Sequence, residues 1–137
     1  MRSTFQSPLW QISVPRPWRA EDCEHCVEIT QPEGAGALHI SGALKQDGDV
    51  LDDETRAQLQ QDCPTDTEFE RVRFGDFSGY GGDYVDWSES AYWKKWFLRS
   101  GRVLLFITYN CKRGDEELEM AQVGQILSSL ECRDEDA

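Results

Sequence analysis

Hydrophobic and polar positions alternate with a period of two along much of the chain, which is the pattern of strands that lie half-buried in a sheet. Residues 10–14 read WQISV and place three apolar side chains on one face, with Gln11 and Ser13 on the other. The segments 27–29 and 38–40 alternate in the same way on either side of the turn sequence QPEGAG. These two segments therefore predict a hairpin.

A second group of alternating segments lies in the later half of the chain. Residues 69–77 alternate and lead into the glycine-rich sequence GYGGDY, which predicts a tight turn or a bulge. Two apolar segments, 92–98 and 103–109, then flank RSGR, where Gly101 supplies the positive φ angle that a hairpin turn needs. The second of these strands begins VLLFI, which is apolar on both faces, so we expect packed layers on both sides of it.

Helical spacing replaces the alternation in residues 53–62. Asp52 or Asp53 is suited to the N-cap position, acidic residues fill the first turn, and Pro64 closes the segment. The apolar stripe of this predicted helix is thin, so we expect the helix to lie on the surface of the sheet.

The segment 115–131, DEELEMAQVGQILSSLE, predicts a second helix because its apolar residues recur every three or four positions. Three acidic residues at its start complement the positive end of the helix dipole. Gly124 costs about 1 kcal/mol of helix stability relative to alanine, and we attribute its presence to a close approach of this helix to the sheet.

The order of these elements is strand, two strands, helix, four strands and helix, which predicts one α+β domain. We expect a mainly antiparallel sheet of six to seven strands with helices packed on both faces. The length of 137 residues suits a single domain, 1–137, with an ordered core over about 8–131. The start lacks the apolar run of a signal peptide, and no segment approaches the roughly 20 apolar residues of a membrane span, so we expect a cytoplasmic protein.

Three quoted segments carry a resemblance to a known fold: LWQISVPRPW, PEGAGALHIS, and WFLRSGRVLLFITYNC followed by VGQILSSLE. Together they resemble the PsbP-like fold over roughly residues 8–131. That fold is shared by the photosystem PsbP proteins, a Ran-binding nuclear-import factor and adaptor proteins of type VI secretion, and the wording is most similar to small bacterial cytosolic proteins. The resemblance rests on packing patterns without a catalytic signature, so it implies a fold and favours binding over catalysis.

The formal charge of −12, from 26 acidic and 14 basic residues, restricts the class of partner. Lys and Arg dominate nucleic-acid affinity and anionic-lipid docking, so this balance disfavours nucleic acid and membranes as partners. If the partner is charged, we expect it to be basic. Residues 45–70 hold nine acids and two bases, whereas residues 90–114 hold six bases and no acid. We expect these two segments to complement each other on the surface.

The sharpest local motif is C-x-x-C at Cys23 and Cys26, in a chain with five cysteines. Such a motif can be half of a zinc site or a redox pair. The other thiols and His39 are scattered along the chain, however, and the acidic neighbours of Cys23 disfavour a thiolate. We therefore favour a pair without a chemical role and expect no metal or other cofactor. A thiol or metal sensor built on Cys23 and Cys26 stays as an alternative.

Aromatic residues concentrate between residues 74 and 97, which hold nine of the 15 in the chain. Trp93 and Trp96 are three positions apart, so a regular strand sends them to opposite faces, and at least part of the set lines a groove or is exposed. Tyr and Trp are favoured at protein interfaces. The alternative is that all nine of these side chains are buried in the core. The predicted binding surface consists of Tyr80, Tyr84, Trp87 and Trp93.

These observations predict a non-enzymatic, acidic protein-binding module, comparable to an immunity protein or an adaptor, whose partner is another protein. The chain contains no nucleophile elbow, zinc-protease helix or phosphate loop. The first alternative is a small-molecule-binding protein or an enzyme that uses the aromatic groove around residues 80–96.

Overall fold

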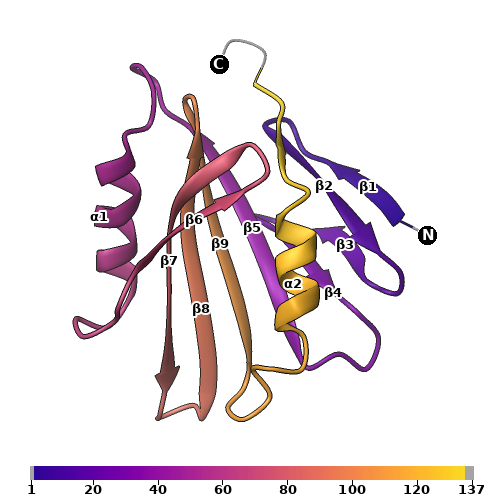
Figure 1. Ribbon diagram of the computed structural model, residues 1–137. Helices are drawn as coiled ribbons and strands as arrows, with labels where there is room; N and C mark the ends of the chain where they lie inside the picture. The colour runs from indigo at the N-terminus through magenta and orange to yellow at the C-terminus, as the bar shows by residue number, and fades with distance from the viewer. Residues whose placement is uncertain (1, 135–137) are drawn as a thin grey trace.

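Ten strands and two helices make up residues 2–134, the part of the chain that the computed structural model describes (Figure 1). In chain order they are β1 (Arg2–Gln6), β2 (Trp10–Pro15), β3 (Arg19–Asp22), β4 (Val27–Thr30), β5 (Gly36–Leu44), α1 (Asp52–Asp62), β6 (Glu70–Phe74), β7 (Phe77–Asp86), β8 (Ala91–Ser100), β9 (Val103–Lys112), α2 (Met120–Leu127) and β10 (Glu131–Cys132).

Seven strands form one sheet in the order β3-β4-β5-β9-β8-β7-β6, and each neighbouring pair in it is antiparallel. A smaller sheet has the order β1-β2-β10 and is also antiparallel. The predicted α+β class with mainly antiparallel sheets is confirmed. The strand number is larger than predicted because β1 and β3 are mostly exposed and β10 has two residues, so none of them shows an apolar alternation.

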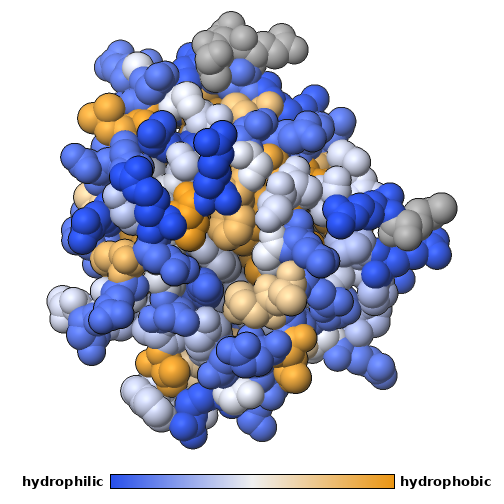
Figure 2. All heavy atoms as spheres, viewed as in Figure 1, coloured by the Kyte–Doolittle hydropathy of each residue, from blue (hydrophilic) through white to orange (hydrophobic). Residues whose placement is uncertain are grey.

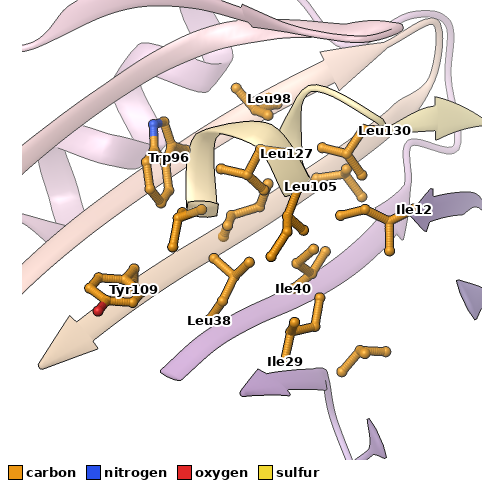
Figure 3. Close-up of a cluster of buried hydrophobic side chains, with 14 of the residues drawn as sticks. Ile12, Ile29, Leu38, Ile40, Trp96, Leu98, Leu105, Tyr109, Leu127 and Leu130 are labelled. Carbon is orange, nitrogen blue, oxygen red and sulfur yellow. The ribbon is translucent and has the colours of Figure 1, made fainter. Parts of the chain in front are cut away.

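The hairpin of β8 and β9 lies at the centre of the large sheet, and its turn contains Gly101 at a φ of 56°, as predicted. Alternate residues of these strands enter two different clusters of buried side chains. Leu105 belongs to the main core with Leu127 of α2 and Ile12 of the small sheet (Figure 3). Phe97 belongs to a smaller cluster with Leu59 of α1.

The first helix, α1, lies where the sequence predicts it, but its N-cap is Leu51 and neither Asp52 nor Asp53. The side chain of Glu54, in the first turn, takes over the capping role, because its Oε1 accepts a hydrogen bond of 2.8 Å from the Leu51 amide. Lys45 also donates to this carboxylate at 2.6 Å.

The second helix is shorter than predicted, since α2 begins at Met120 and the three acids at residues 115–117 lie in turns before it. Non-local contacts of Glu119 hold this segment. Its buried carboxylate accepts hydrogen bonds from the Gly36 amide at 2.9 Å and from the Tyr109 hydroxyl at 2.7 Å, and Gln31 donates to it as well. The helix therefore starts one residue after this anchor.

The sequence GYGGDY is not a turn, because β7 runs straight through it and the turn lies earlier, at Gly75, whose φ is 60°. The glycines make room for the neighbouring strand. A Cβ at Gly81 would collide with the indole ring of Trp96, which is 2% exposed. Gly124 shows the opposite situation: a Cβ there would have no heavy atom within 4 Å, so the predicted close approach of the second helix to the sheet at this residue is wrong.

These two glycines give opposite expectations for substitution by alanine. We expect Gly81→Ala to lower the free energy of unfolding by about 1–3 kcal/mol, because the Trp96 ring must move. Gly124→Ala should raise it by about 0.5–1 kcal/mol, because alanine favours the helix and meets nothing. Urea denaturation of both variants beside the wild type measures the difference, and equal effects of the two substitutions would contradict this account.

The Glu119 anchor predicts a dependence of stability on pH. Burial raises the pKa of this carboxyl, but the hydrogen bonds donated by Gln31, Tyr109 and the Gly36 amide outweigh burial, so the pKa lies below its usual value. A lowered pKa means that ionised Glu119 stabilises the fold above the pKa of the unfolded chain, and this contribution disappears as the pH falls through the folded-state value.

Glu119→Gln should therefore reduce the free energy of unfolding at pH 7 by about 1–3 kcal/mol, because it weakens hydrogen bonds to a charged group. It should also flatten the loss of stability between neutral pH and acid. Urea denaturation across this range gives both quantities. The exposed neighbour Glu117 provides the control, since Glu117→Gln should behave as the wild type. An unchanged acid limb in Glu119→Gln would show that the anchor does not carry this dependence.

Candidate binding face

The four aromatic residues of the predicted binding surface lie on one hairpin, but they occupy three different settings. Tyr84 on β7 stands directly opposite Trp93 on β8 in the strand register. Tyr80 stands opposite Phe97, further along the same ladder, and Trp87 lies in the turn that joins the two strands. The structure therefore brings Tyr84 and Trp93 together and leaves Trp87 apart, while Tyr80 and Tyr84 both pack against the small cluster of Leu59, Cys63 and Phe97.

Lys95 organises the Tyr84–Trp93 pair. Its Nζ lies 5.3 Å from the centroid of each ring, a distance at which a cation is attracted to an aromatic face. The same ammonium donates a hydrogen bond of 2.9 Å to the backbone oxygen of Asp62, the last residue of α1. Both rings are half-buried and adjoin the end of the helix. Sequence reasoning missed Lys95, although its position on the same strand as Trp93 and two residues after it, hence on the same face, was a usable signal.

Tyr80 has structural contacts that account for its side chain. Its hydroxyl accepts a hydrogen bond from Arg71 at 3.0 Å and donates one to Asp52 at 3.1 Å. The guanidinium groups of Arg56 and Arg71 lie 5.7 and 5.4 Å from its ring centroid. Tyr80 thus ties β7 to the first turn of α1, and its ring is occupied from within the chain.

Trp87 is the most exposed large hydrophobic side chain among the described residues, at 72%. The guanidinium carbon of Arg113 lies 4.8 Å from its ring centroid. Asp86 shapes the turn by accepting hydrogen bonds from the Ser88 amide and hydroxyl. This turn and the β9–α2 loop that carries Arg113 lie at the same end of the molecule (Figure 1).

The strand beside this turn has an open edge. The edge strand β6 pairs with β7 over residues 77–81, and residues 67–69 pack against the buried Gly82, so within residues 2–134 the side away from β8 has no paired strand at residues 83–86. Unpaired amide and carbonyl groups on such an edge are a template for a further strand. Asp83 is exposed on this edge, and its carboxylate gives the edge a negative charge.

Ion pairs connect the acidic and basic segments in part. Arg99, from the basic segment, lies 4.0 Å from a carboxylate oxygen of Asp52, from the acidic one, and Arg71 also pairs with Asp52. Lys95 reaches the end of α1 through a backbone oxygen. The expected complementarity of the two segments is therefore centred on α1.

The C-x-x-C motif flanks the turn between β3 and β4, where the Cys23 amide donates to the Cys26 carbonyl at 2.8 Å. Partial burial raises the pKa of the Cys26 thiol, and the neighbouring Cys23 and Glu28 raise it further, which disfavours a reactive thiolate. Within the described part of the chain, no group of three or more His, Cys, Asp and Glu side chains could hold a metal ion. The local geometry gives the sensor alternative no support.

Cavities on the described surface have volumes from about 340 to 660 Å³. None of those described is lined by Tyr80, Tyr84, Trp87 or Trp93. One of these cavities, of about 340 Å³, nevertheless lies beside the hairpin, where Gly81, Gly82, Asp83 and Lys94 line it together with residues 68–70.

The comparisons with known proteins show solved structures with a similar fold and no matching family. No family model and no curated protein matches the chain. A crystal structure from Bacteroides thetaiotaomicron VPI-5482 superposes with a TM-score of 0.66 at 18% identity over 98% of this chain, and the chain spans about half, 49%, of that protein. LpqN, involved in cell envelope biogenesis of Mycobacterium tuberculosis, superposes with a TM-score of 0.53 at 15% identity over 96% of this chain and 90% of its own.

These identities show a shared fold alone. The class defined by fold and face together is an α+β domain with an aromatic hairpin at one edge of its large sheet. Neither helix has the length and apolar character needed to cross a bilayer.

Two tryptophans test the division between face and core. We expect Trp87→Ala to lower the free energy of unfolding by less than about 1 kcal/mol, because the ring is exposed and loses the Arg113 contact alone. Trp96→Ala should cost about 3–5 kcal/mol, because this ring is 2% exposed within the main core. Chemical denaturation measures both, and a large loss in Trp87→Ala would place that ring in the core.

Proposed function

We propose that this protein is a non-enzymatic module that binds another protein through a docking surface made of Trp87, the Tyr84–Trp93 pair and the open edge at residues 83–86. The observation that carries the proposal is the 72% exposure of Trp87 at the end of a hairpin whose outer edge is unpaired within the described residues. The face seen in Figure 2 carries mostly polar residues, with apolar residues in small groups.

The composition of the docking surface suits protein recognition. Tryptophan and tyrosine combine large contact area with few rotatable bonds and dominate the energetics of interfaces. Arg113 and Lys95 already hold the rings, so binding orders less of the surface. An extended segment of the partner can add a strand at residues 83–86, with backbone hydrogen bonds giving affinity and Tyr84 giving specificity.

The partner that fits this surface is basic. The chain as a whole carries a formal charge of −12, and this charge supports a basic partner, while the docking surface itself combines Asp83, Asp86 and Glu89 with Lys95 and Arg113. A basic protein gains association rate and orientation from such a field, whereas nucleic acid and anionic membranes are repelled. An immunity-like or adaptor-like role, in which an acidic protein holds a basic one, follows from this pairing.

We also propose the finer fold assignment and the location. Leu59 of α1 packs with Phe97, whereas Val123 of α2 packs in the core that contains Leu98, the next residue of β8. This supports a PsbP-like arrangement with one helix on each face of the large sheet. A cytoplasmic location is proposed as well, which the five free cysteines support, because unpaired thiols are typical of a reducing compartment. Cell fractionation with an antibody to the native protein tests the location.

The docking surface is tested by quantitative capture from a lysate of the producing cells. Wild-type protein, Trp87→Ala and the control Leu51→Ala serve as baits at low and high salt. Leu51 is 60% exposed at the start of α1, so its variant removes a comparable exposed apolar group away from the docking surface. We expect a partner that Leu51→Ala retains, Trp87→Ala loses by at least tenfold, and high salt weakens.

The purified partner should then reproduce these ratios in a direct binding assay. Equal binding by Trp87→Ala and the wild type would contradict the proposed docking surface. Equal binding at low and high salt would contradict a basic partner.

A further inference from the structure

A cavity of about 460 Å³ lies at the end of the molecule that carries the Trp87 turn. Three segments line it: residues 34–37 at the start of β5, residues 89–91 at the start of β8, and residues 110–112 at the end of β9. The β4–β5 loop, the β7–β8 turn and the β9–α2 loop meet at this end (Figure 1). The volume falls within the range of ligand sites, about 300–1,000 Å³.

Small residues supply much of the cavity wall, namely Gly34, Ala35, Gly36, Ala37 and Ala91. No side chain at these positions extends beyond Cβ, so the cavity has room for a side chain from another molecule. The strand register connects the cavity to the docking surface. Ala37 stands opposite Asn110, and Asn110 stands opposite Trp93, so the row that begins with Tyr84 and Trp93 ends at the cavity.

Hydrogen bonds hold two walls of the cavity in place. The Gly36 amide donates to the buried carboxylate of Glu119 at 2.9 Å, which fixes the start of β5. The Arg113 amide donates to the Ser90 carbonyl at 3.0 Å, which joins the β9–α2 loop to the β7–β8 turn. Walls that are ordered before binding reduce the entropy that binding costs.

Exposed apolar side chains gather at the same end of the molecule. The described residues include three large hydrophobic side chains that are exposed, and two of them, Trp87 at 72% and Leu118 at 69%, belong to the β7–β8 turn and the β9–α2 loop. The third, Leu51, belongs to the β5–α1 loop at the other end (Figure 1). Exposed aromatic and aliphatic groups beside a cavity are typical anchors of an interface.

The segments around the cavity, 31–37, 86–91 and 110–118, are acidic on balance. Their two bases are Lys112 and Arg113, and Arg113 lies against the Trp87 ring. Their acids that are at least partly exposed are Glu33, Asp86, Glu89, Asp115, Glu116 and Glu117. This excess of carboxylates favours a ligand that carries positive charge beside its apolar group, and it disfavours a second copy of the same acidic chain.

We propose that this end of the molecule is a second contact zone for the basic partner, made of the cavity and Leu118. It accepts a short segment in which one apolar side chain lies between Lys or Arg residues. The apolar side chain enters the cavity beside the small residues, and the cations face Glu33 and Glu89. This inference rests on the proposed function, because it assigns a further contact to the same partner.

Two short peptides test the contact zone on the intact protein. Acetyl-Lys-Leu-Lys-amide is the probe, and acetyl-Glu-Leu-Glu-amide is the control with the same apolar side chain and the opposite charge. Nuclear magnetic resonance follows the amide signals of Ala35, Ala37 and Ala91 and the methyl signals of Leu118. We expect saturable shifts of these signals with the basic peptide, binding at least about tenfold weaker with the acidic one, and a loss of affinity at high salt.

Two variants connect the shifts to the contact zone. Leu118→Ala should weaken binding of the basic peptide about tenfold, because it removes one apolar anchor, and its exposed position leaves the fold intact. Ala37→Leu should abolish binding by filling the cavity. Leu51→Ala removes a comparable exposed group at the other end and should bind the peptide as the wild type does.

Unshifted signals with the basic peptide up to its solubility limit overturn the inference, as do equal affinities for the two peptides or equal binding by Leu118→Ala and the wild type. Capture of the protein partner separates this result from the proposed function. A partner that Trp87→Ala loses and Leu118→Ala retains removes the second contact zone and leaves the docking surface in place. A partner that Trp87→Ala retains removes the docking surface, whatever the peptides do.

Discussion

The ladder between β8 and β9 positions every other layer of the molecule. Three strands extend beyond β9 and two beyond β8, and alternate residues of the two strands enter separate cores. A slip of one residue would exchange Leu105 for Phe106 and turn each face of the strand over. Since both faces of β9 are apolar, polarity alone does not prevent such a slip. Side-chain shape and the fixed turn at Gly101 must set the register instead.

Much of the fold follows from the sequence because its determinants are local. The strand alternation at residues 10–14, the hairpin around Gly101 and the position of α1 depend on neighbours within a few residues. The start of α2 does not, because it is fixed by Glu119 and Gly36, 83 positions apart. The glycines of β7 were misinterpreted for the same reason. In the sequence they indicate a turn, whereas in the structure Gly81 makes room for the ring of Trp96 on the neighbouring strand.

The binding face was predictable in composition and less so in arrangement. Placing Trp93 and Trp96 on opposite faces needs nothing beyond strand geometry, and the structure confirms it, with Trp96 buried and Trp93 half-buried. Tyr80 could not be distinguished from Tyr84 by sequence, because the difference lies in contacts with distant residues: the Tyr80 hydroxyl donates to Asp52, whereas Lys95 lies against the Tyr84 ring. The open edge depends on β6 being half the length of β7, a relation between two elements that neither shows alone.

The loop between β9 and α2 has two anchors whose roles differ. At one end, Arg113 stacks on Trp87; at the other, Glu119 is bound to the strand β5 through Gly36. Local opening of such a loop requires less free energy than global unfolding. One opening event would free the Trp87 ring and admit water to the Glu119 carboxylate together. Amide hydrogen exchange at Gly36 would therefore slow when a partner holds the Trp87 turn, although Gly36 begins β5 and Trp87 lies in the turn between β7 and β8.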